Sequence, residues 1–243
     1  QTVTATNYEY EIGDGSYGFV NRNSGSTGNT FTISGGKAIL GNKGKFIYSS
    51  DKNGNIINST DMEMLSTATD GENYGIYATG TVTNSGKIEF TKGKGNVGIY
   101  ATEDGNITNS GNIELGESDA ANKKYSIGII AKPGKVTNSG TIKIGDSANS
   151  IDGKDGIGLF ADSENGKNGE IITTGAITTE ETGSAGIYAD ESDATNESTG
   201  TITSKKGSSA GIYATAKTAK DIKNEGIIEV GLTTAPSETQ GVG

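Results

Sequence analysis

Short apolar segments recur along the chain, and within each of them apolar and polar positions alternate. The segment 97–102 reads Val-Gly-Ile-Tyr-Ala-Thr. Successive side chains of a β-strand point to opposite faces. We therefore predict a strand over 97–102 that turns Val97, Ile99 and Ala101 inward and Tyr100 outward. Apolar residues at the i, i+3, i+4, i+7 spacing of an amphipathic helix are not sustained in any window, so helices are not expected.

A second kind of segment follows each of these strands. Residues 107–115 read Ile-Thr-Asn-Ser-Gly-Asn-Ile-Glu-Leu. The same alternation predicts that Ile107, Asn109, Ile113 and Leu115 point inward. The Asn-Ser-Gly between the two apolar parts predicts a turn, in which the glycine is free to take a positive φ.

The two segments form one motif that repeats through most of the chain. Successive first-part glycines are 23, 30, 30, 28 and 25 residues apart. Internal repeats of this length indicate a solenoid, a propeller or an array. The first part reads Gly-Ile-Tyr-Ala or a close variant and begins at Gly75, Gly98, Gly128, Gly158, Gly186 and Gly211.

Three short strands and three turns in about 25–30 residues fit one coil of a parallel β-helix, whereas a propeller blade takes about 40 residues. The predicted fold is therefore an all-β solenoid, with about nine coils along the chain. The residue before each first-part glycine is assigned to the inside, namely Tyr74, Val97, Ile127, Ile157, Ala185 and Ala210. The predicted core also includes Ile99, Ala101, Ile113, Leu115, Ile129, Ile142, Ile144, Ile187, Ile212 and Ile228.

Stacking of the coils places equivalent side chains above one another. Asn84, Asn109, Asn138 and Asn224 are then expected to form a ladder of hydrogen-bonded amides along the axis, a structural role rather than a ligand site. Coil length varies mainly before Val97, Ile127 and Ile157, where polar loops are expected to protrude from one corner.

The organisation along the chain changes near residue 45. Residues 1–45 fit the repeat poorly and are expected to form an irregular β-segment that begins or caps the solenoid. Residues 46–243 are expected to hold the β-helix repeats in one domain. The end, Gln240–Gly243, resembles the opening of a further first motif, so we expect the chain to be a segment of a longer solenoid.

Composition narrows the function classes. Only 31% of the residues are hydrophobic, which a β-helix tolerates because stacked columns and backbone ladders add to its stability. The absence of cysteine and histidine excludes disulfides, thiolate metal sites and histidine-based catalysis. A net charge of −10, with one arginine, Arg22, argues against nucleic acid or an anionic membrane as partner. No run of apolar residues is long enough for a membrane helix.

The repeated pair of motifs resembles a known family. Gly-Ile-Tyr-Ala followed by Ile-Thr-Asn-Ser-Gly-x-Ile is similar to the passenger domains of large type V autotransporter adhesins, most like those of fusobacteria. The resemblance covers about residues 46–243. It implies a right-handed parallel β-helix displayed on the bacterial surface by a C-terminal outer-membrane β-barrel, which is absent from this sequence. It also implies adhesion to a protein or glycan on host or bacterial cells. From the residues themselves, we expect no enzymatic activity and no cofactor. The shared motif is scaffold, so it transfers no binding residue.

One set of residues is a candidate binding site. The outward position of the first motif is aromatic in most repeats, and exposed aromatic rings suit stacking on sugars and contacts with proteins. The alternative is that the rings only pack on one another or lie under loops. Ile130 completes the column, whose aromatic members are Tyr77, Tyr100, Phe160, Tyr188 and Tyr213.

The rival hypothesis is a carbohydrate-active enzyme, either a lyase or a hydrolase, on the same fold. Glycoside hydrolysis needs two carboxylates at a defined separation. The sequences Glu180-Glu181 and 190–193 offer carboxylates, but we interpret them as solvated acidic loops. The stretch 51–55 superficially resembles a calcium loop and is interpreted as a turn. The sequence therefore predicts no catalytic residue and no metal ligand.

Overall fold

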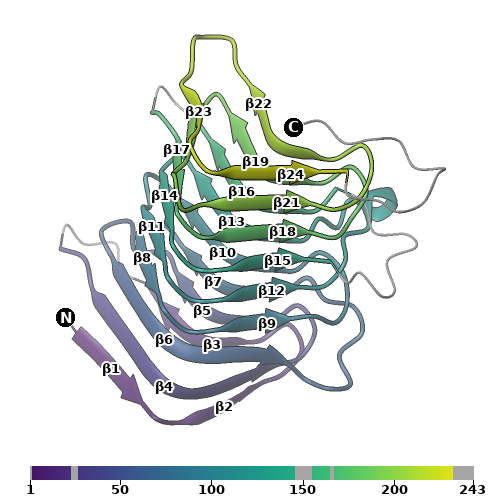
Figure 1. The fold of residues 1–243 in the computed structure, drawn as a ribbon. Helices are drawn as coiled ribbons and strands as arrows, with labels where there is room; N and C mark the ends of the chain where they lie inside the picture. The colour runs from purple at the N-terminus through teal and green to yellow at the C-terminus, as the bar shows by residue number, and fades with distance from the viewer. Residues whose placement is uncertain (1, 23–26, 146–154, 165–166, 232–243) are drawn as a thin grey trace.

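The computed structural model describes residues 2–22, 27–145, 155–164 and 167–231. Its strands stack coil upon coil around one continuous core, so the chain forms a parallel β-solenoid of about eight turns (Figure 1). This confirms the predicted fold class, with about eight turns in place of the nine expected. Ile, Val, Thr and Tyr dominate the strands because branched and aromatic side chains pack well on a pleated surface.

Three faces surround the core. The first face contains the Gly-Ile-Tyr-Ala segments in β7 (Tyr74–Ala78), β10 (Val97–Thr102), β13 (Ile127–Lys132), β16 (Ile157–Asp162), β19 (Ala185–Asp190) and β22 (Ala210–Thr215), after β3 (Tyr17–Asn21) and β5 (Lys45–Ser49). The second face contains β1 (Thr2–Thr6), β8 (Thr81–Asn84), β11 (Ile107–Asn109), β14 (Lys135–Asn138), β17 (Glu170–Thr173), β20 (Asp193–Asn196) and β23 (Ile222–Asn224). The third face contains β2 (Glu9–Ile12), β9 (Ile88–Phe90), β12 (Ile113–Leu115), β15 (Ile142–Ile144), β18 (Ala176–Thr179), β21 (Thr201–Ser204) and β24 (Ile227–Val230).

Two long strands belong to more than one face. β4 (Thr30–Leu40) and β6 (Asn55–Met64) pair along their length with strands of both the second and the third face. A short 3₁₀ helix, η1 (Ala120–Asn122), lies in the corner loop between β12 and β13. As expected, this loop lies at the corner that leads into the first face (Figure 1).

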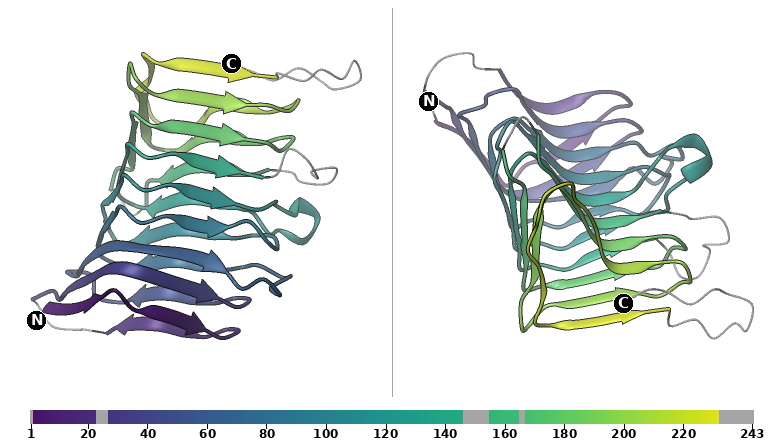
Figure 2. Two further views of the ribbon diagram at one scale, coloured as in Figure 1. Left: turned by 60° about the horizontal axis from the view of Figure 1, so that its bottom comes forward. Right: turned by 90° about the horizontal axis from the view of Figure 1, so that it is seen from above.

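Equivalent positions of neighbouring coils pair in register. Asn109 pairs with Asn84 on one side and with Asn138 on the other. Viewed with the N-terminal end at the bottom, the front strands run from left to right as the chain rises, so the solenoid is right-handed (Figure 1). Parallel crossover connections have this hand almost without exception. Figure 2 shows the same stack from two further directions.

The core follows the predicted inward positions in the middle of the stack. Ile99, Ile113, Ile129 and Ile144 are at most 1% exposed. Complete burial of one such side chain contributes about 1.5–3 kcal/mol. Two predicted core residues, Ile212 and Ile228, are only partly buried, because they belong to the last described coil and have a neighbouring coil on one side only.

The N-terminal segment is more regular than the sequence suggested. β1 and β2 pair in parallel with β4, and β3 pairs with β5, so residues 2–40 belong to the same stack as the later coils. The irregularity is confined to a shift of register in β4 between Ser34 and Lys37. Large rings fill the core at this end, where Tyr10, Phe19 and Phe46 lie with ring centroids 5.2–5.5 Å apart.

The asparagine ladder exists and is longer than predicted. The Nδ2 atoms of Asn58, Asn84 and Asn109 each donate a 2.8 Å hydrogen bond to Oδ1 of the asparagine in the next coil. The ladder resumes higher up, where Asn196 Nδ2 donates to Asn224 Oδ1 at 2.7 Å. Between these two parts, Thr173 occupies the ladder position. The structural interpretation of these asparagines therefore accounts for their hydrogen bonds.

Glycine is required in the Asn-Ser-Gly turn for a different reason from the one predicted. Gly111 and Gly140 do not adopt positive φ. A Cβ atom on Gly140 would instead lie 2.0 Å from the carbonyl oxygen of Gly111 in the coil below. The close approach of stacked backbones therefore requires glycine here, and a left-handed conformation does not.

A second polar column lies at the corner before the first face. It consists of the residue two positions before each first-part glycine. Gly44 N donates to Asn73 Oδ1 at 2.8 Å, and Asn73 N donates to Asn96 Oδ1 at 3.1 Å. Ser126, Ser184 and Ser209 continue the column and are buried, whereas Gly156 interrupts it.

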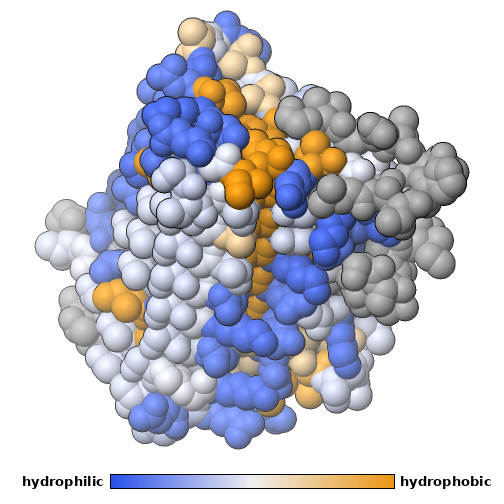
Figure 3. Space-filling view, viewed as in Figure 1, coloured by the Kyte–Doolittle hydropathy of each residue, from blue (hydrophilic) through white to orange (hydrophobic). Residues whose placement is uncertain are grey.

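The outer surfaces of the second and third faces are largely hydrophilic. Figure 3 shows this side, with apolar surface gathered toward the end that carries β22–β24. Ile222 is 43% exposed and Ile227 is 57% exposed there. The predicted motif at Gln240–Gly243 lies outside the described residues. In the described part of the chain, no helix has the length and apolar character needed to cross a membrane.

Candidate functional site

The predicted aromatic residues form one column on the outside of the first face. Parallel pairing in register places Tyr77 next to Tyr100 and Phe160 next to Tyr188, which is followed by Tyr213. Their ring centroids lie 4.9 Å apart for the first pair and 5.1 Å apart for each of the next two. We call this set the aromatic column, together with Ile130 and with Tyr48, which stacks on Tyr77. The predicted arrangement is thus present, and its role in binding stays a prediction.

Most rings of the column are half-buried by their neighbours, so ring packing accounts for part of their presence. Burial raises the pKa of the Tyr77 and Tyr100 hydroxyls above their ordinary value. Both hydroxyls are therefore protonated hydrogen-bond donors at neutral pH. Tyr213 at the end of the column is 50% exposed and offers the largest open ring surface.

The residue before each first-part glycine points outward, contrary to the prediction. Ile127 and Ile130, three positions apart, both line the outer surface. Between them, a Cβ on Gly128 would lie 2.7 Å from Cγ2 of the core residue Ile142, so the glycine faces inward like Ile129. Two consecutive inward positions break the strict alternation of the strand, as a β-bulge does. Tyr74, Val97, Ile127, Ile157, Ala185 and Ala210 therefore form a second outer column, which we call the flanking column.

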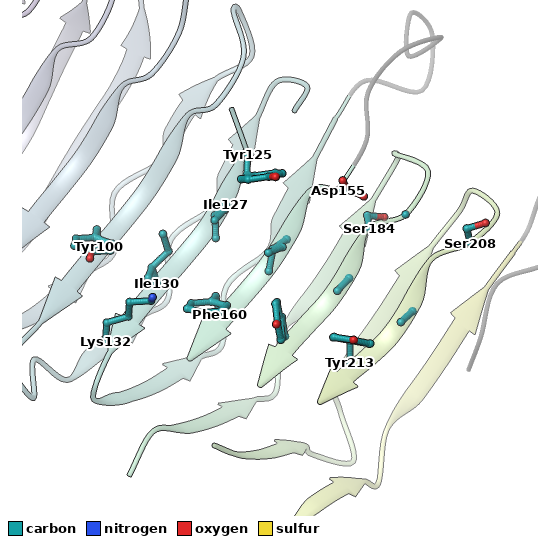
Figure 4. Close-up of a pocket in the computed structure, with 15 residues that line it drawn as sticks. Tyr100, Tyr125, Ile127, Ile130, Lys132, Asp155, Phe160, Ser184, Ser208 and Tyr213 are labelled. Atoms are coloured by element: carbon teal, nitrogen blue, oxygen red, sulfur yellow. The ribbon is translucent and has the colours of Figure 1, made fainter. Parts of the chain in front are cut away.

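The flanking column becomes smaller toward the C-terminal end and opens a groove. The groove has a volume of about 650 Å³ and runs along the solenoid axis beside the aromatic column. Figure 4 shows the aromatic residues along one side and Tyr125, Asp155, Ser184 and Ser208 along the other. The replacement of Ile157 by Ala185 and Ala210 in successive coils deepens the floor. The result is an apolar floor with a polar rim, as small-molecule and peptide sites have.

Charged residues lie beside the aromatic column, and one of them, Lys132, also lines the groove. Lys132 Nζ lies 5.2 Å from the centroid of the Phe160 ring and 3.2 Å from Asp162 Oδ2. Asp190 is the register partner of Asp162 in the next coil, and Thr215 Oγ1 donates to its Oδ1 at 2.5 Å. The described chain thus places one ammonium and two carboxylates beside these rings.

A second, charged groove meets the first at Tyr100 and Lys132. Its lining includes Glu103, Glu164 and the ion pair between Lys167 and Asp104. Carboxylates and lysines from adjacent coils therefore converge here, which is the kind of cluster that the enzymatic hypothesis requires. Both Lys132 and Lys167 are engaged by carboxylates, so neither is an uncommitted base. Among the described residues, no group of three or more acidic side chains is arranged to hold a metal ion.

The interpretation of Glu180-Glu181 as a solvated loop is wrong, because both side chains are buried. Glu180 pairs with Lys205, whose Nζ lies 2.6 Å from Glu180 Oε1. Glu181 is 0% exposed, and its Oε1 accepts a 2.5 Å hydrogen bond from the backbone nitrogen of Ser118, two coils below. A Cβ on Gly156 would lie 2.4 Å from Glu181 Oε2, so the carboxyl fills the gap that this glycine leaves in the corner column.

The interpretation of the stretch 51–55 as a turn is confirmed. The stretch 51–55 forms a turn, in which the backbone nitrogens of Gly54 and Asn53 donate to the Asp51 carbonyl and carboxylate oxygens.

Sequence reasoning missed the groove, because it assigned the residues of the groove floor to the core. The signal that could have revealed it is the decrease in size from Tyr74 to Ala210, since a core column would keep a constant volume.

Comparison with known proteins finds no family model, no curated protein and no solved structure that matches the chain.

Proposed function

We propose that this chain is a surface-displayed adhesive segment of an autotransporter passenger, which contacts its partner through the aromatic column and the adjacent groove. The observation that carries the proposal is the groove itself, with half-exposed rings beside an apolar floor on an otherwise hydrophilic solenoid. Aromatic side chains in such positions commonly supply the contacts that dominate protein interfaces. The partner is a protein or glycan on a host or bacterial cell.

The proposal includes the location of the protein. The resemblance to autotransporter passengers supports display on the bacterial surface, with attachment through a C-terminal outer-membrane β-barrel outside this sequence. An open, shallow groove gives modest affinity at a single site. Display of many copies on a cell would raise the effective affinity through multivalency.

The test is adhesion of cells that display the passenger. The triple variant Tyr100→Ser, Tyr188→Ser, Tyr213→Ser removes ring surface from the groove, so we expect fewer adherent partner cells. The matched control replaces three outward threonines of the second face, Thr83, Thr108 and Thr137, with serine. Circular dichroism and thermal melting establish that both variants are folded.

The outcomes separate adhesion from packing. If the folded triple variant adheres like the control, the column serves only to cover the sheet. If removal of whole coils with the register preserved also leaves adhesion unchanged, the segment is a spacer and the adhesive function is rejected.

The charged groove supports a second candidate, a carbohydrate-active enzyme. Its substrate would be a polysaccharide lying across the coils that carry Glu103 and Glu164. Incubation of the purified chain with a panel of polysaccharides, followed by measurement of new reducing ends, tests it. Loss of a detected activity in Glu164→Gln would establish this candidate, and a panel without cleavage would remove its support.

A further inference from the structure

The structure contains a cation-binding arrangement that the chain fills with its own lysine. In β16, Phe160 and Asp162 lie two positions apart on the outer surface. The Lys132 ammonium from the coil below sits 5.2 Å from the ring centroid and 3.2 Å from the carboxylate. Both distances are those of favourable interactions, a cation–π contact and an ion pair. Figure 4 shows Lys132 beside Phe160 at the edge of the groove.

The next coil repeats the aromatic ring and the carboxylate of this arrangement. Tyr188 is the register partner of Phe160, and Asp190 is the register partner of Asp162. The ammonium is not repeated, because the residue one coil below that corresponds to Lys132 is Asp162 itself. Among the described residues, no lysine forms an ion pair with Asp190 or a cation–π contact with Tyr188.

The first face accommodates a lysine between rings elsewhere as well. Lys45 Nζ lies 5.2 Å from the centroid of Tyr17 and 5.1 Å from the centroid of Tyr74. The outer surface of this face is therefore suited to ammonium groups wherever rings stand close together. Tyr188 and Tyr213 are such a pair, with centroids 5.1 Å apart.

We propose that Tyr188 and Asp190 form a site for a lysine side chain of a partner protein, with the adjacent groove receiving apolar residues beside that lysine. Charge favours this partner, because Asp190 lies in register with Asp162, and among the described residues only Asp162 of the two forms an ion pair with a lysine. The whole chain also carries a net charge of −10. The groove floor at Ala185 and Ala210 leaves room next to Tyr188 for those apolar residues. This inference rests on the proposed adhesive function and specifies the chemistry of its partner.

The probe is a short peptide with one lysine between two leucines, compared with the same peptide carrying N-ε-acetyl-lysine. Titration followed by NMR shifts of the Tyr188 and Tyr213 rings gives both dissociation constants. We expect the lysine peptide to bind more tightly. Tyr188→Leu and Asp190→Asn should each weaken its binding by about two- to five-fold, the range for an exposed cation–π contact or ion pair.

Matched controls separate this site from general attraction to an acidic protein. Glu170→Gln removes one negative charge from the second face, and Tyr8→Leu removes a tyrosine that is 62% exposed at the N-terminal end. Both should leave binding unchanged. Asp162→Lys places a lysine in register with Lys132, next to Tyr188 and Asp190, and should weaken binding by competition from within the chain.

Each outcome decides the inference independently of the proposed function. Equal binding of the two peptides, or equal effects of Asp190→Asn and Glu170→Gln, would overturn the lysine site. If cell adhesion still fell in the tyrosine triple variant, the adhesive function would stand with a neutral partner such as a glycan. If adhesion were also unaffected, both proposals would fail.

Discussion

Thr173 interrupts the asparagine ladder and leaves one buried atom without a partner. Asn138 Nδ2 donates to Thr173 Oγ1 at 3.3 Å, which is longer than the 2.8 Å bonds between asparagines. The threonine hydroxyl lies 3.3 Å from the carbonyl oxygen of Asn138, to which it donates. In the next coil Asn196 Oδ1 is buried and receives no hydrogen bond. A buried acceptor in this condition costs about 1–3 kcal/mol.

Thr173→Asn should therefore stabilise the fold. The position is 0% exposed. Gly175 also stacks on Gly140 as Gly111 stacks on Gly86, since a Cβ would lie 2.0 Å and 2.1 Å, respectively, from the carbonyl oxygen of the glycine below. An asparagine can then accept from Asn138 and donate to Asn196. We expect the free energy of unfolding in urea to rise by about 1 kcal/mol. Thr195→Asn, an outward change in the neighbouring strand, is the control, and an equal gain there would contradict the ladder explanation.

Glu181 makes stability depend on pH. Burial raises the pKa of its carboxyl, and the nearby Glu117 acts in the same direction, although the hydrogen bond from Ser118 opposes them. A carboxyl with a raised pKa stabilises the fold fully below the pKa of the unfolded chain. That contribution is lost as pH rises through the folded pKa. The ionised form is the costly one here, because the carboxyl is buried and, within the described part of the chain, forms no ion pair with a lysine or arginine.

The test compares Glu181→Gln with the wild type. Glutamine keeps the acceptor for the Ser118 nitrogen and carries no charge at any pH. We expect the wild-type stability, relative to the variant, to fall as pH is raised from about 4 to about 8. Urea unfolding at each pH measures it, and Glu170→Gln on the surface is the control. If the free energies of unfolding of wild type and Glu181→Gln changed in parallel with pH, burial would not raise the pKa of this carboxyl.

At the scale of the strand, the distance between stacked backbones decides which turns need glycine. A Cβ on Gly140 would meet a backbone oxygen at 2.0 Å, and neither backbone can move without shifting its whole coil. Gly140→Ala should therefore lower the free energy of unfolding by about 1–3 kcal/mol, as overpacking does. At Gly13, where the nearest atom lies 3.8 Å away and φ is not positive, alanine should be tolerated. Thermal unfolding of both variants checks the contrast, and similar losses would contradict it.

Sequence alternation predicted the strands well and failed at one position. Ile107, Asn109 and Leu115 point inward as expected, because their segments keep a strict period of two. The first motif does not keep that period, since the glycine and the following residue both face inward. A single sequence gives no direct signal for such a bulge, so the flanking column was assigned to the core. The groove was missed for the same reason, although the decrease in residue size from Tyr74 to Ala210 along the flanking column was a signal of it.

At the scale of the molecule, the repeat predicted the solenoid because each coil can bury its apolar residues only against its neighbours. The same reasoning did not predict the N-terminal coils. Their strands pair in register, although their sequence lacks the Gly-Ile-Tyr-Ala motif. Backbone pairing tolerates any sequence that presents apolar residues at the inward positions, such as Phe31, Ile33 and Leu40. A search for the Gly-Ile-Tyr-Ala motif therefore finds fewer coils than the solenoid contains.

The stack also predicts how stability is distributed along the axis. Solenoid stability is approximately a sum of coil terms and nearest-neighbour interfaces, so a coil with one described neighbour is held less firmly than a coil with two. In β23, the inward residue Ile222 is 43% exposed, although its register partner Ala194 in the coil below is fully buried. The inward residues Ile212 and Ile228 of β22 and β24 are only partly buried, whereas Ile99 and Ile129 in β10 and β13 are fully buried. We therefore expect amide hydrogens of β22–β24 to exchange well before those of β10–β16.

Native-state hydrogen exchange followed by mass spectrometry tests this gradient, because exchange protection reports local opening. The groove extends from Tyr100 to Tyr213, so its upper end belongs to the less protected coils. A bound partner that spans the groove should then raise protection in β19 and β22 more than in β10. Uniform exchange along the whole stack would show that the chain opens as one unit, and that the nearest-neighbour description does not apply to it.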